Sequence, residues 1–203
     1  MRQLPLPISA AAEPSLESYV PGANAEALER VCALAAGRLE EPILYLWGEP
    51  GSGRSHLLGA AARANPSMVI ADDVETLDAE AQQALFIAIN TAREGGPAVL
   101  AAGNAPPGLL TLREDLRTRL GWGLVYELKP LTDVEKAQHL RAEAERRGLR
   151  LSDEVVWYLL THLPRDLASL HEVLDRVDRH ALARQRAVTL PLIREALSTA
   201  GDD

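Results

Sequence analysis

Eight consecutive residues, Gly48-Glu49-Pro50-Gly51-Ser52-Gly53-Arg54-Ser55, follow the pattern of a phosphate-binding loop, with arginine where lysine is usual. An apolar run, Ile43–Trp47, precedes the loop, and a helix-forming stretch, His56–Ala64, follows it. Glycines allow successive backbone N–H groups to point at one anion, and the helix N-terminus adds partial positive charge. We therefore expect a polyphosphate site, with Arg54 at the β/γ-phosphates and the Ser55 hydroxyl on Mg²⁺.

Two carboxylates stand at the end of the next apolar run. Asp72 is placed to hold Mg²⁺, directly or through water, and Asp73 to polarise an attacking water. Asn104 follows a further apolar run, at the strand end where open α/β sheets gather ligand groups. The alternatives are a helix cap or turn for the aspartates and a simple turn for Asn104.

Three arginines are candidates for stabilising phosphoryl charge. Arg117 and Arg119 precede the turn Gly121-Trp122-Gly123, and Arg165 begins a helical stretch near the carboxyl end. Arginine stabilises phosphoryl groups in transfer, from the same chain or from a neighbour. Any one of them taken alone would more often be a surface ion-pair residue.

The elements that must position these groups alternate in type. The pattern predicts α/β architecture, a parallel sheet flanked by helices, followed by an all-helical region after a boundary at Pro130-Leu131-Thr132. Asn24 and Asp78 are the expected caps of helices running to about Gly37 and Arg93. Strands are expected at 43–47, 68–71, 98–102 and 124–128, and helices at 56–64, 113–119, 133–147, 152–162, 165–183 and 190–198.

Composition narrows the class of protein. The 203 residues carry a net charge of −8, so little direct binding to nucleic acid is expected, although Arg141–Arg150 and Arg176–Arg186 are arginine-rich. Such stretches are more commonly solvated helix faces. Cys32 is the single cysteine, no signal peptide is recognised, and no apolar stretch approaches a membrane span. The expectation is a cytoplasmic protein without a membrane role.

Taken together, these motifs resemble the AAA+ ATPases, and most closely the DnaA/Hda family, over nearly the whole chain. The resemblance implies an ADP or ATP site with Mg²⁺ on Ser55 and Asp72. It also implies a catalytic role for Asp73 and an arginine finger at Arg119, with Arg117 as the alternative. The nucleotide-binding residues it implies are Tyr19, Val20, Gly48, Gly51, Ser52, Gly53, Arg54, Ser55, His56, Asn104 and Arg165.

The amino-terminal segment Gln3-Leu4-Pro5-Leu6-Pro7-Ile8 resembles the sequence by which Hda-type members of the family dock on the sliding clamp, the DNA polymerase III beta subunit. Two prolines keep such a segment extended and lower the entropic cost of binding. Gln3, Leu4, Leu6, Pro7 and Ile8 are the implied clamp contacts. A proline-rich tail without a partner is the alternative. The expected division is a tail at 1–15, a nucleotide-binding subdomain at 16–130 and a helical lid at 131–203.

Two departures from the family pattern bear on function. A strand and a helix are missing between Ala64 and Met68, at the expected sheet edge, and too few residues follow the lid for a helix-turn-helix domain. The resemblance implies a clamp-docked regulator of replication initiation that stimulates ATP hydrolysis by DnaA, with homo-oligomerisation left open. The alternatives are an AAA+ motor or helicase loader, which Arg54 and Asp73 disfavour, and a nucleotide-independent adaptor, which the intact loop disfavours.

Overall fold

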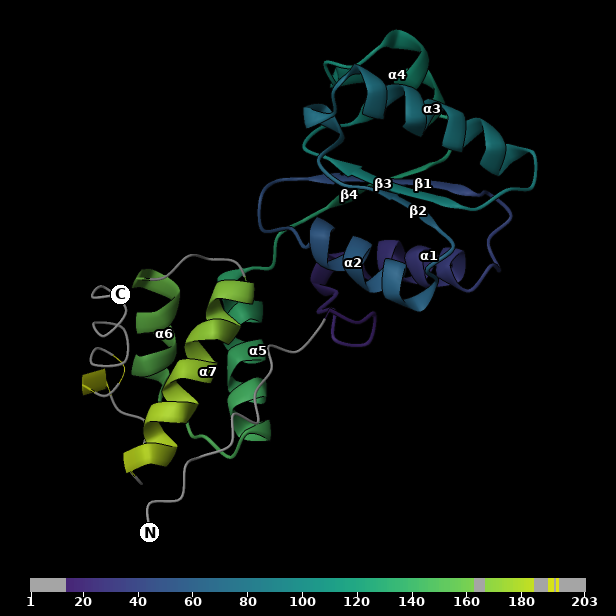
Figure 1. Ribbon diagram of the computed structural model, residues 1–203. Helices are drawn as coiled ribbons and strands as arrows, with labels where there is room; N and C mark the ends of the chain where they lie inside the picture. Colours follow the sequence, from purple (N-terminus) through teal and green to yellow (C-terminus); the bar gives the residue numbers. More distant parts are fainter. Residues whose placement is uncertain (1–13, 163–166, 185–189, 192, 194–203) are drawn as a thin grey trace. The chain divides into compact units, whose positions relative to one another are not determined.

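The computed structural model describes residues 14–162, 167–184, 190, 191 and 193, and the chain divides into two compact units at Pro130 and Leu131. The first unit alternates strands with helices (Figure 1). Its strands are β1 Ile43–Gly48, β2 Val69–Ala71, β3 Val99–Gly103 and β4 Leu124–Leu128, and its helices are α1 Ala25–Ala35, α2 Arg54–Ala64, α3 Ala79–Arg93 and α4 Glu114–Leu120, with 3₁₀ turns at Gly22–Asn24, Val74–Thr76 and Pro107–Leu109.

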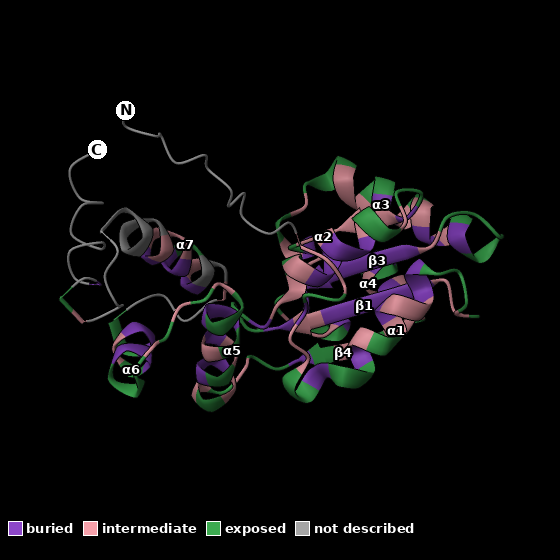
Figure 2. Ribbon diagram, turned by 90° about the horizontal axis from the view of Figure 1, so that it is seen from below, coloured by how far each residue is buried: buried purple, intermediate pink, exposed green. Residues whose placement is uncertain are grey.

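The four strands form one parallel sheet in the order β2-β3-β1-β4. β1 and β3 occupy the centre, and both are buried almost throughout, as Figure 2 shows. Their near-continuous apolar sequences match this burial, because helices cover both faces of a parallel sheet. The α/β architecture expected from the sequence is confirmed.

Each face of the sheet has its own core. α1 and α2 lie on one face, where Val31, Leu57 and Leu58 pack against strand residues that include Leu44 and Leu46 (Figure 1). α3 and α4 lie on the other face, and their buried residues pack against the opposite side of β1. Successive β1 residues thus point to alternate faces. The loop after Gly48 is thereby held at the carboxyl ends of the strands.

The predicted helix caps have different outcomes. The Asp78 side chain accepts a hydrogen bond from the Ala81 N–H at 2.8 Å, so the predicted cap of α3 is confirmed. Asn24 precedes α1, but its side chain makes no capping bond. Its amide instead donates to the Lys129 carbonyl at 2.8 Å and accepts from the Lys129 N–H at 2.8 Å. The cap prediction at Asn24 was therefore wrong, because a long-range partner takes the amide.

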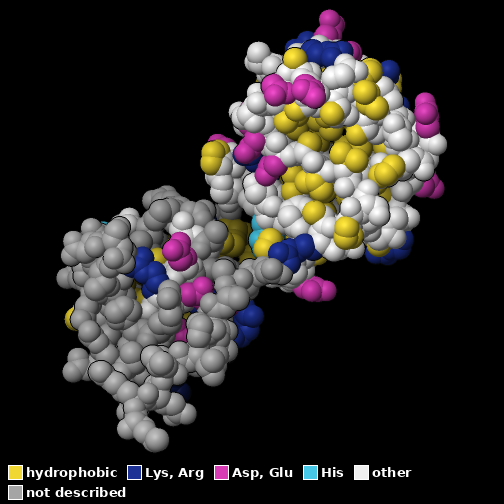
Figure 3. Space-filling view, viewed as in Figure 1, with side chains coloured by type: hydrophobic (Ala, Val, Ile, Leu, Met, Phe, Trp, Pro, Cys, Tyr) yellow, Lys and Arg dark blue, Asp and Glu magenta, His cyan; other side chains and the backbone are white. Residues whose placement is uncertain are grey.

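β2 forms one edge of the sheet and follows α2 after a short connection. Its residues Val69, Ile70 and Ala71 are half-buried. Figure 3 shows the α/β unit from the side of this edge, and hydrophobic side chains gather on it. The sequence predicts that a strand and a helix of the family pattern are missing at this point of the chain, and β2 indeed follows α2 directly.

The second unit is helical among its described residues. It contains α5 Asp133–Arg146, α6 Asp153–His162 and α7 Leu167–Arg184. Thr132 and Glu135 form a reciprocal capping box at the start of α5. The core of the unit includes Leu140, Leu159 and Leu174. Within the described part of the chain, no helix has the length and apolarity needed to cross a membrane.

Candidate functional site

The phosphate-loop sequence forms a tight turn that leads directly into α2. Gly51 and Gly53 have φ angles of +83° and +93°, which residues with a Cβ rarely adopt. Gly53 is the N-cap of α2, and no side chain caps the helix there. The first-turn N–H groups of α2 are therefore left for an anion, at the positive end of the helix dipole.

The loop is packed closely from two sides. A Cβ on Gly48 would collide with the Leu128 carbonyl oxygen, and one on Gly53 would lie 2.8 Å from Cε2 of Tyr19. The Tyr19 ring therefore lies against the loop backbone, and its hydroxyl is 3.4 Å from the Ser52 carbonyl oxygen. Gly48 is consequently required by contact, and Gly53 by contact as well as by conformation.

Two buried polar atoms of the loop have no hydrogen-bond partner among the described residues, the Ser52 Oγ and one terminal guanidinium nitrogen of Arg54. The other terminal nitrogen of Arg54 lies 3.4 Å from an Asp73 carboxylate oxygen. A buried polar atom without a partner costs free energy unless a ligand satisfies it. Both atoms belong to the loop sequence and can donate to phosphate oxygens, so the residues present fit a nucleotide polyphosphate.

Asp72 and Asp73 join the loop at the end of β2. Asp73 has a φ of +42°, the only non-glycine residue among those described with positive φ, and its N–H donates to the Asp72 carboxylate at 2.9 Å. Ser55 is exposed at the start of α2. No cluster of three or more metal-ligating side chains exists in the described ranges. A Mg²⁺ ion here would depend on Ser55, Asp72, phosphate oxygens and water.

A buried tyrosine supports the loop that carries Asn104. The Tyr45 hydroxyl donates to the Ala105 carbonyl at 2.8 Å, and the Asn104 N–H lies 3.3 Å from a Glu75 carboxylate oxygen. Burial raises the pKa of Tyr45 well above its ordinary value, and the nearby Glu75 charge raises it further. The Asn104 side chain is exposed, near the end of the sheet where Asp73 and Arg54 lie.

Tyr19 and its neighbours close the other side of the loop. The Tyr19 ring is 5.7 Å from the His56 ring, and Asn24 donates to its hydroxyl at 3.3 Å. Burial raises the pKa of Tyr19, while the bond from Asn24 lowers it. His56 also contacts Ser18 through its Nε2 at 3.3 Å. The structure therefore brings Tyr19 and His56 beside the loop, and Val20, the residue after Tyr19, is half-buried.

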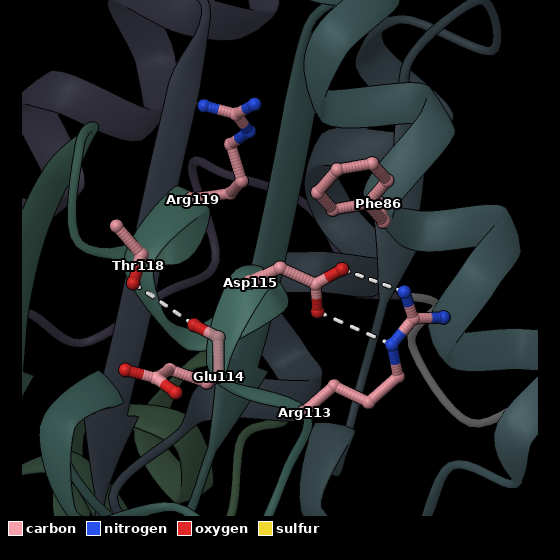
Figure 4. A pocket seen from close by; sticks show the side chains of 6 residues that line it. All are labelled: Phe86, Arg113, Glu114, Asp115, Thr118 and Arg119. Atoms are coloured by element: carbon pink, nitrogen blue, oxygen red, sulfur yellow. Dashed lines mark hydrogen bonds and ion pairs between the residues drawn. The ribbon is translucent and has the colours of Figure 1, made fainter.

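Arg119 lies away from the phosphate loop, against two aromatic rings. Its guanidinium carbon is 3.8 Å from the ring centroid of Trp122 and 5.4 Å from that of Phe86. Figure 4 shows the guanidinium directed away from Asp115, which is paired with Arg113 on the other side of Phe86. No ion pair of Arg119 occurs within the described residues, and its buried Nε has no partner there. An open pocket of about 680 Å³ adjoins it, lined by Phe86, Arg113, Glu114, Asp115, Thr118 and Arg119.

Arg119 and the phosphate loop lie at opposite ends of the parallel strands. Gly123 approaches the Ile43 backbone at the beginning of β1, whereas the loop follows Gly48 at its end. Five residue steps along a strand span about 16 Å. Arg93 contacts both Trp122 and Glu41, which precedes β1. Arg93, Trp122 and Arg119 therefore lie near the amino ends of the strands.

Several predicted residues lie outside the described part of the chain. They are Arg165 and the tail residues Gln3, Leu4, Leu6, Pro7 and Ile8. Sequence reasoning missed the supporting side chains of Tyr45, Glu75, Phe86 and Trp122. Trp122 stands in the turn next to Arg119 and could have been noticed from that proximity. Phe86 gives no such local signal, because it lies on another helix.

Known proteins show related sequences and folds. The family model for the Hda lid domain matches residues 133–197. A protein of Haemophilus influenzae described as uncharacterized is 31% identical over 229 residues, which cover 97% of this chain and 99% of that protein. Domain III of DnaA from Thermotoga maritima superposes with a TM-score of 0.72 at 18% identity, covering 93% of this chain and 97% of that one.

DnaA from Aquifex aeolicus, solved with AMPPCP, gives a TM-score of 0.66 at 22% identity, covering 81% of this chain and 64% of that one. At such identities the solved structures support the fold, and the lid-domain match adds the family. The chain therefore belongs to the DnaA/Hda family of AAA+ proteins.

Proposed function

We propose that this protein is a nucleotide-dependent regulator of replication initiation that docks on the DNA-loaded sliding clamp and stimulates hydrolysis of DnaA-bound ATP. The Hda lid match and the DnaA-like fold support a DnaA-related regulator. The clamp contact rests on the resemblance of Gln3–Ile8 to the docking segment of the family.

An adenine nucleotide, ADP or ATP, is the proposed ligand of the phosphate loop. The unpartnered Ser52 and Arg54 atoms and the uncapped start of α2 support this. DnaA has been solved with AMPPCP by itself and together with single-stranded DNA. In this chain the loop N–H groups and Arg54 would bind the phosphates, Ser55 and Asp72 would hold Mg²⁺, and Tyr19 would lie beside the base.

Hydrolysis at this chain's own site is proposed to be slow. Arg54 replaces the usual lysine, and its planar guanidinium is paired with Asp73. Asp73 is also one carbon shorter than the glutamate usual in the family. A misplacement of about 1 Å in such a site can cost about a hundredfold in rate. The protein would therefore act on the nucleotide of a neighbour.

The observation that carries this proposal is the position of Arg119. It is half-buried against two aromatic rings and has no carboxylate partner within the described residues. It lies at the amino ends of the strands, opposite its own phosphate loop. A cation so placed can act on a phosphate of another subunit. We propose that Arg119 completes the ATP site of an adjacent DnaA. Arg117 is two residues away and, within the described residues, contacts neither a carboxylate nor an aromatic ring.

Arg119→Ala and Arg117→Ala form the matched test. Both variants should fold, bind nucleotide and bind the clamp. Arginine fingers contribute about 10³–10⁵ in rate in other phosphoryl-transfer systems, so Arg119→Ala should abolish stimulation of DnaA while Arg117→Ala retains it. The reverse result would move the role to Arg117. Full stimulation by both variants would refute the arginine-finger mechanism for this chain.

A further inference from the structure

Trp122 is the aromatic residue closest to the Arg119 guanidinium. The indole lies in the turn that follows α4, and Arg119 stacks on it at 3.8 Å from the ring centroid. Arg93 approaches the same ring at 4.9 Å. The Trp122 side chain is 43% exposed, although a large aromatic residue would usually be buried further. Its position is thus better suited to holding a surface cation than to filling the core.

The arginines around this turn are restrained in different ways. Arg113 pairs with Asp115 at 2.6 Å, and Arg93 lies 3.8 Å from Glu41. Arg119 has no such partner within the described residues, and aromatic rings contact it instead. A carboxylate would restrain the side chain but would also neutralise its charge. An aromatic face restrains the side chain and leaves the full positive charge for another group.

Restraint of this kind matters for a cation that acts across an interface. An arginine side chain has many rotamers, and this conformational freedom is lost when it is fixed in a site. Stacking on Trp122 fixes part of the side chain before the partner arrives. The cost of ordering it is then met in the free protein and not in the assembled transition state.

We infer that Trp122 is the positioning residue of Arg119, holding the guanidinium ordered and uncompensated for phosphoryl charge on a neighbouring subunit. This inference rests on the proposed function of Arg119. Trp122 acts through Arg119 and needs no contact with nucleotide. Phe86 provides a second ring, but it lies further from Arg119 and also faces Arg113 at 5.9 Å.

The experiment compares Trp122→Ala and Trp122→Phe with wild type in stimulating hydrolysis of DnaA-bound ATP on DNA-loaded clamp. The protein concentration is varied, so that the maximal rate and the half-saturating concentration are measured separately. Trp122→Ala should lower the maximal rate about tenfold, as expected from losing a partly desolvated cation–π contact. The half-saturating concentration should change by less than about twofold. Trp122→Phe keeps an aromatic face and should recover most of the rate.

Two controls test whether the loss of rate comes from the contact between Trp122 and Arg119. Trp157, on α6, is similarly exposed at 46%, so Trp157→Ala removes a matched tryptophan and should leave the rate unchanged. In an Arg119→Lys background, which keeps a cation but lacks the planar guanidinium, Trp122→Ala should cause a smaller fold loss of rate than in wild type, because the two residues act as one unit. The melting temperature of each variant verifies that it is folded.

The outcomes distinguish this inference from the function on which it rests. Loss with Arg119→Ala but a wild-type rate with Trp122→Ala would refute the positioning role and leave the proposed function intact. No loss with Arg119→Ala would refute the proposed function itself. If Trp122→Phe is as impaired as Trp122→Ala, an aromatic platform is not what Arg119 needs, and the inference fails.

Discussion

At the scale of single residues, the conformation of the phosphate loop depends on Gly53. Gly53 combines a φ of +93° with direct contact to the Tyr19 ring. Gly53→Val would strain the backbone and displace Tyr19 from the loop, so nucleotide binding should be abolished. The sequence suggested this loss because phosphate approaches bare backbone at this point, and the structure adds Tyr19 as a second cause. Titration calorimetry with ADP measures the effect.

Gly51→Ala is the matched control for Gly53→Val. Gly51 has a φ of +83°, but nothing lies within 4 Å of the position its Cβ would occupy. Alanine should therefore cost only backbone strain, about 1–2 kcal/mol, and should leave Tyr19 in place. Equal losses of ADP affinity in both variants would show that the contact with Tyr19 does not matter.

The Arg54–Asp73 pair gives a second prediction at this scale. Asp73 pairs with a guanidinium nitrogen that could otherwise bind a phosphate of the proposed nucleotide, and its negative charge would repel those phosphates. Asp73→Asn should therefore tighten ADP binding about two- to fivefold, a small effect because the carboxylate is 55% exposed.

Asp72→Asn is the comparison for Asp73→Asn, and it should weaken the dependence of binding on Mg²⁺. Fluorescence titrations of a labelled ADP with and without Mg²⁺ would measure both. Weaker ADP binding by Asp73→Asn would contradict this account of the pair.

Residues close together in sequence could be predicted, and those joined only by the fold could not. The phosphate loop was predictable because its glycines and Ser55 are contiguous. The pairing of Arg54 with Asp73 depends on how β2 ends, including the positive φ of Asp73, and no local pattern signals it. Phe86 reaches Arg119 from another helix, so its role also needed the fold.

At the scale of elements, Asn24 ties the start of α1 to the end of β4. It is 4% exposed, and its amide satisfies both the N–H and the carbonyl of Lys129. Asn24→Ala leaves those backbone groups without partners and should lower the free energy of unfolding by about 2–3 kcal/mol. Asp78→Ala removes an exposed cap and should cost about 1 kcal/mol.

Urea unfolding of the two variants tests this difference. An Asn24→Ala cost no larger than that of Asp78→Ala would mean that Asn24 is not a structural tie. Nucleotide affinity should also fall in Asn24→Ala alone, since Asn24 bonds the Tyr19 hydroxyl.

Most elements were predictable because their signals are local. The apolar runs of β1 and β3 are buried on both faces, and Asp78 and Thr132 cap their helices through neighbouring residues. The Asn24 prediction failed because its amide is used by Lys129, a residue far along the chain. Sequence patterns do not show such competition between local and distant partners.

At the scale of the whole molecule, the tail and the nucleotide site are expected to act independently. The tail lies outside the described residues, and the phosphate loop is held by Tyr19, Leu128 and other residues of the α/β unit. Gln3→Ala combined with Leu6→Ala should abolish clamp binding, leave ADP affinity unchanged and hardly move the melting temperature. Clamp pull-down and calorimetry on the same preparation give both readouts, and unchanged clamp affinity would refute the docking proposal.

Arg119 and the phosphate loop lie at opposite ends of the strands of one sheet, so the α/β unit has two distinct candidate sites. We propose that one end holds a nucleotide of its own and that the other offers a cation to a neighbour. This arrangement explains how a protein with slow hydrolysis at its own site could still govern hydrolysis elsewhere. It also predicts that stimulation requires a DnaA molecule whose nucleotide site faces Arg119.

Hydrolysis of DnaA-bound ATP is the measurement that tests this most directly. It should be followed with this protein alone, with DNA-loaded clamp alone, and with both together. We expect little hydrolysis above the DnaA background with either component alone and strong stimulation with both, which Arg119→Ala should abolish. Hydrolysis that stays at the background rate with both components present would refute the proposal that this protein stimulates DnaA on the clamp.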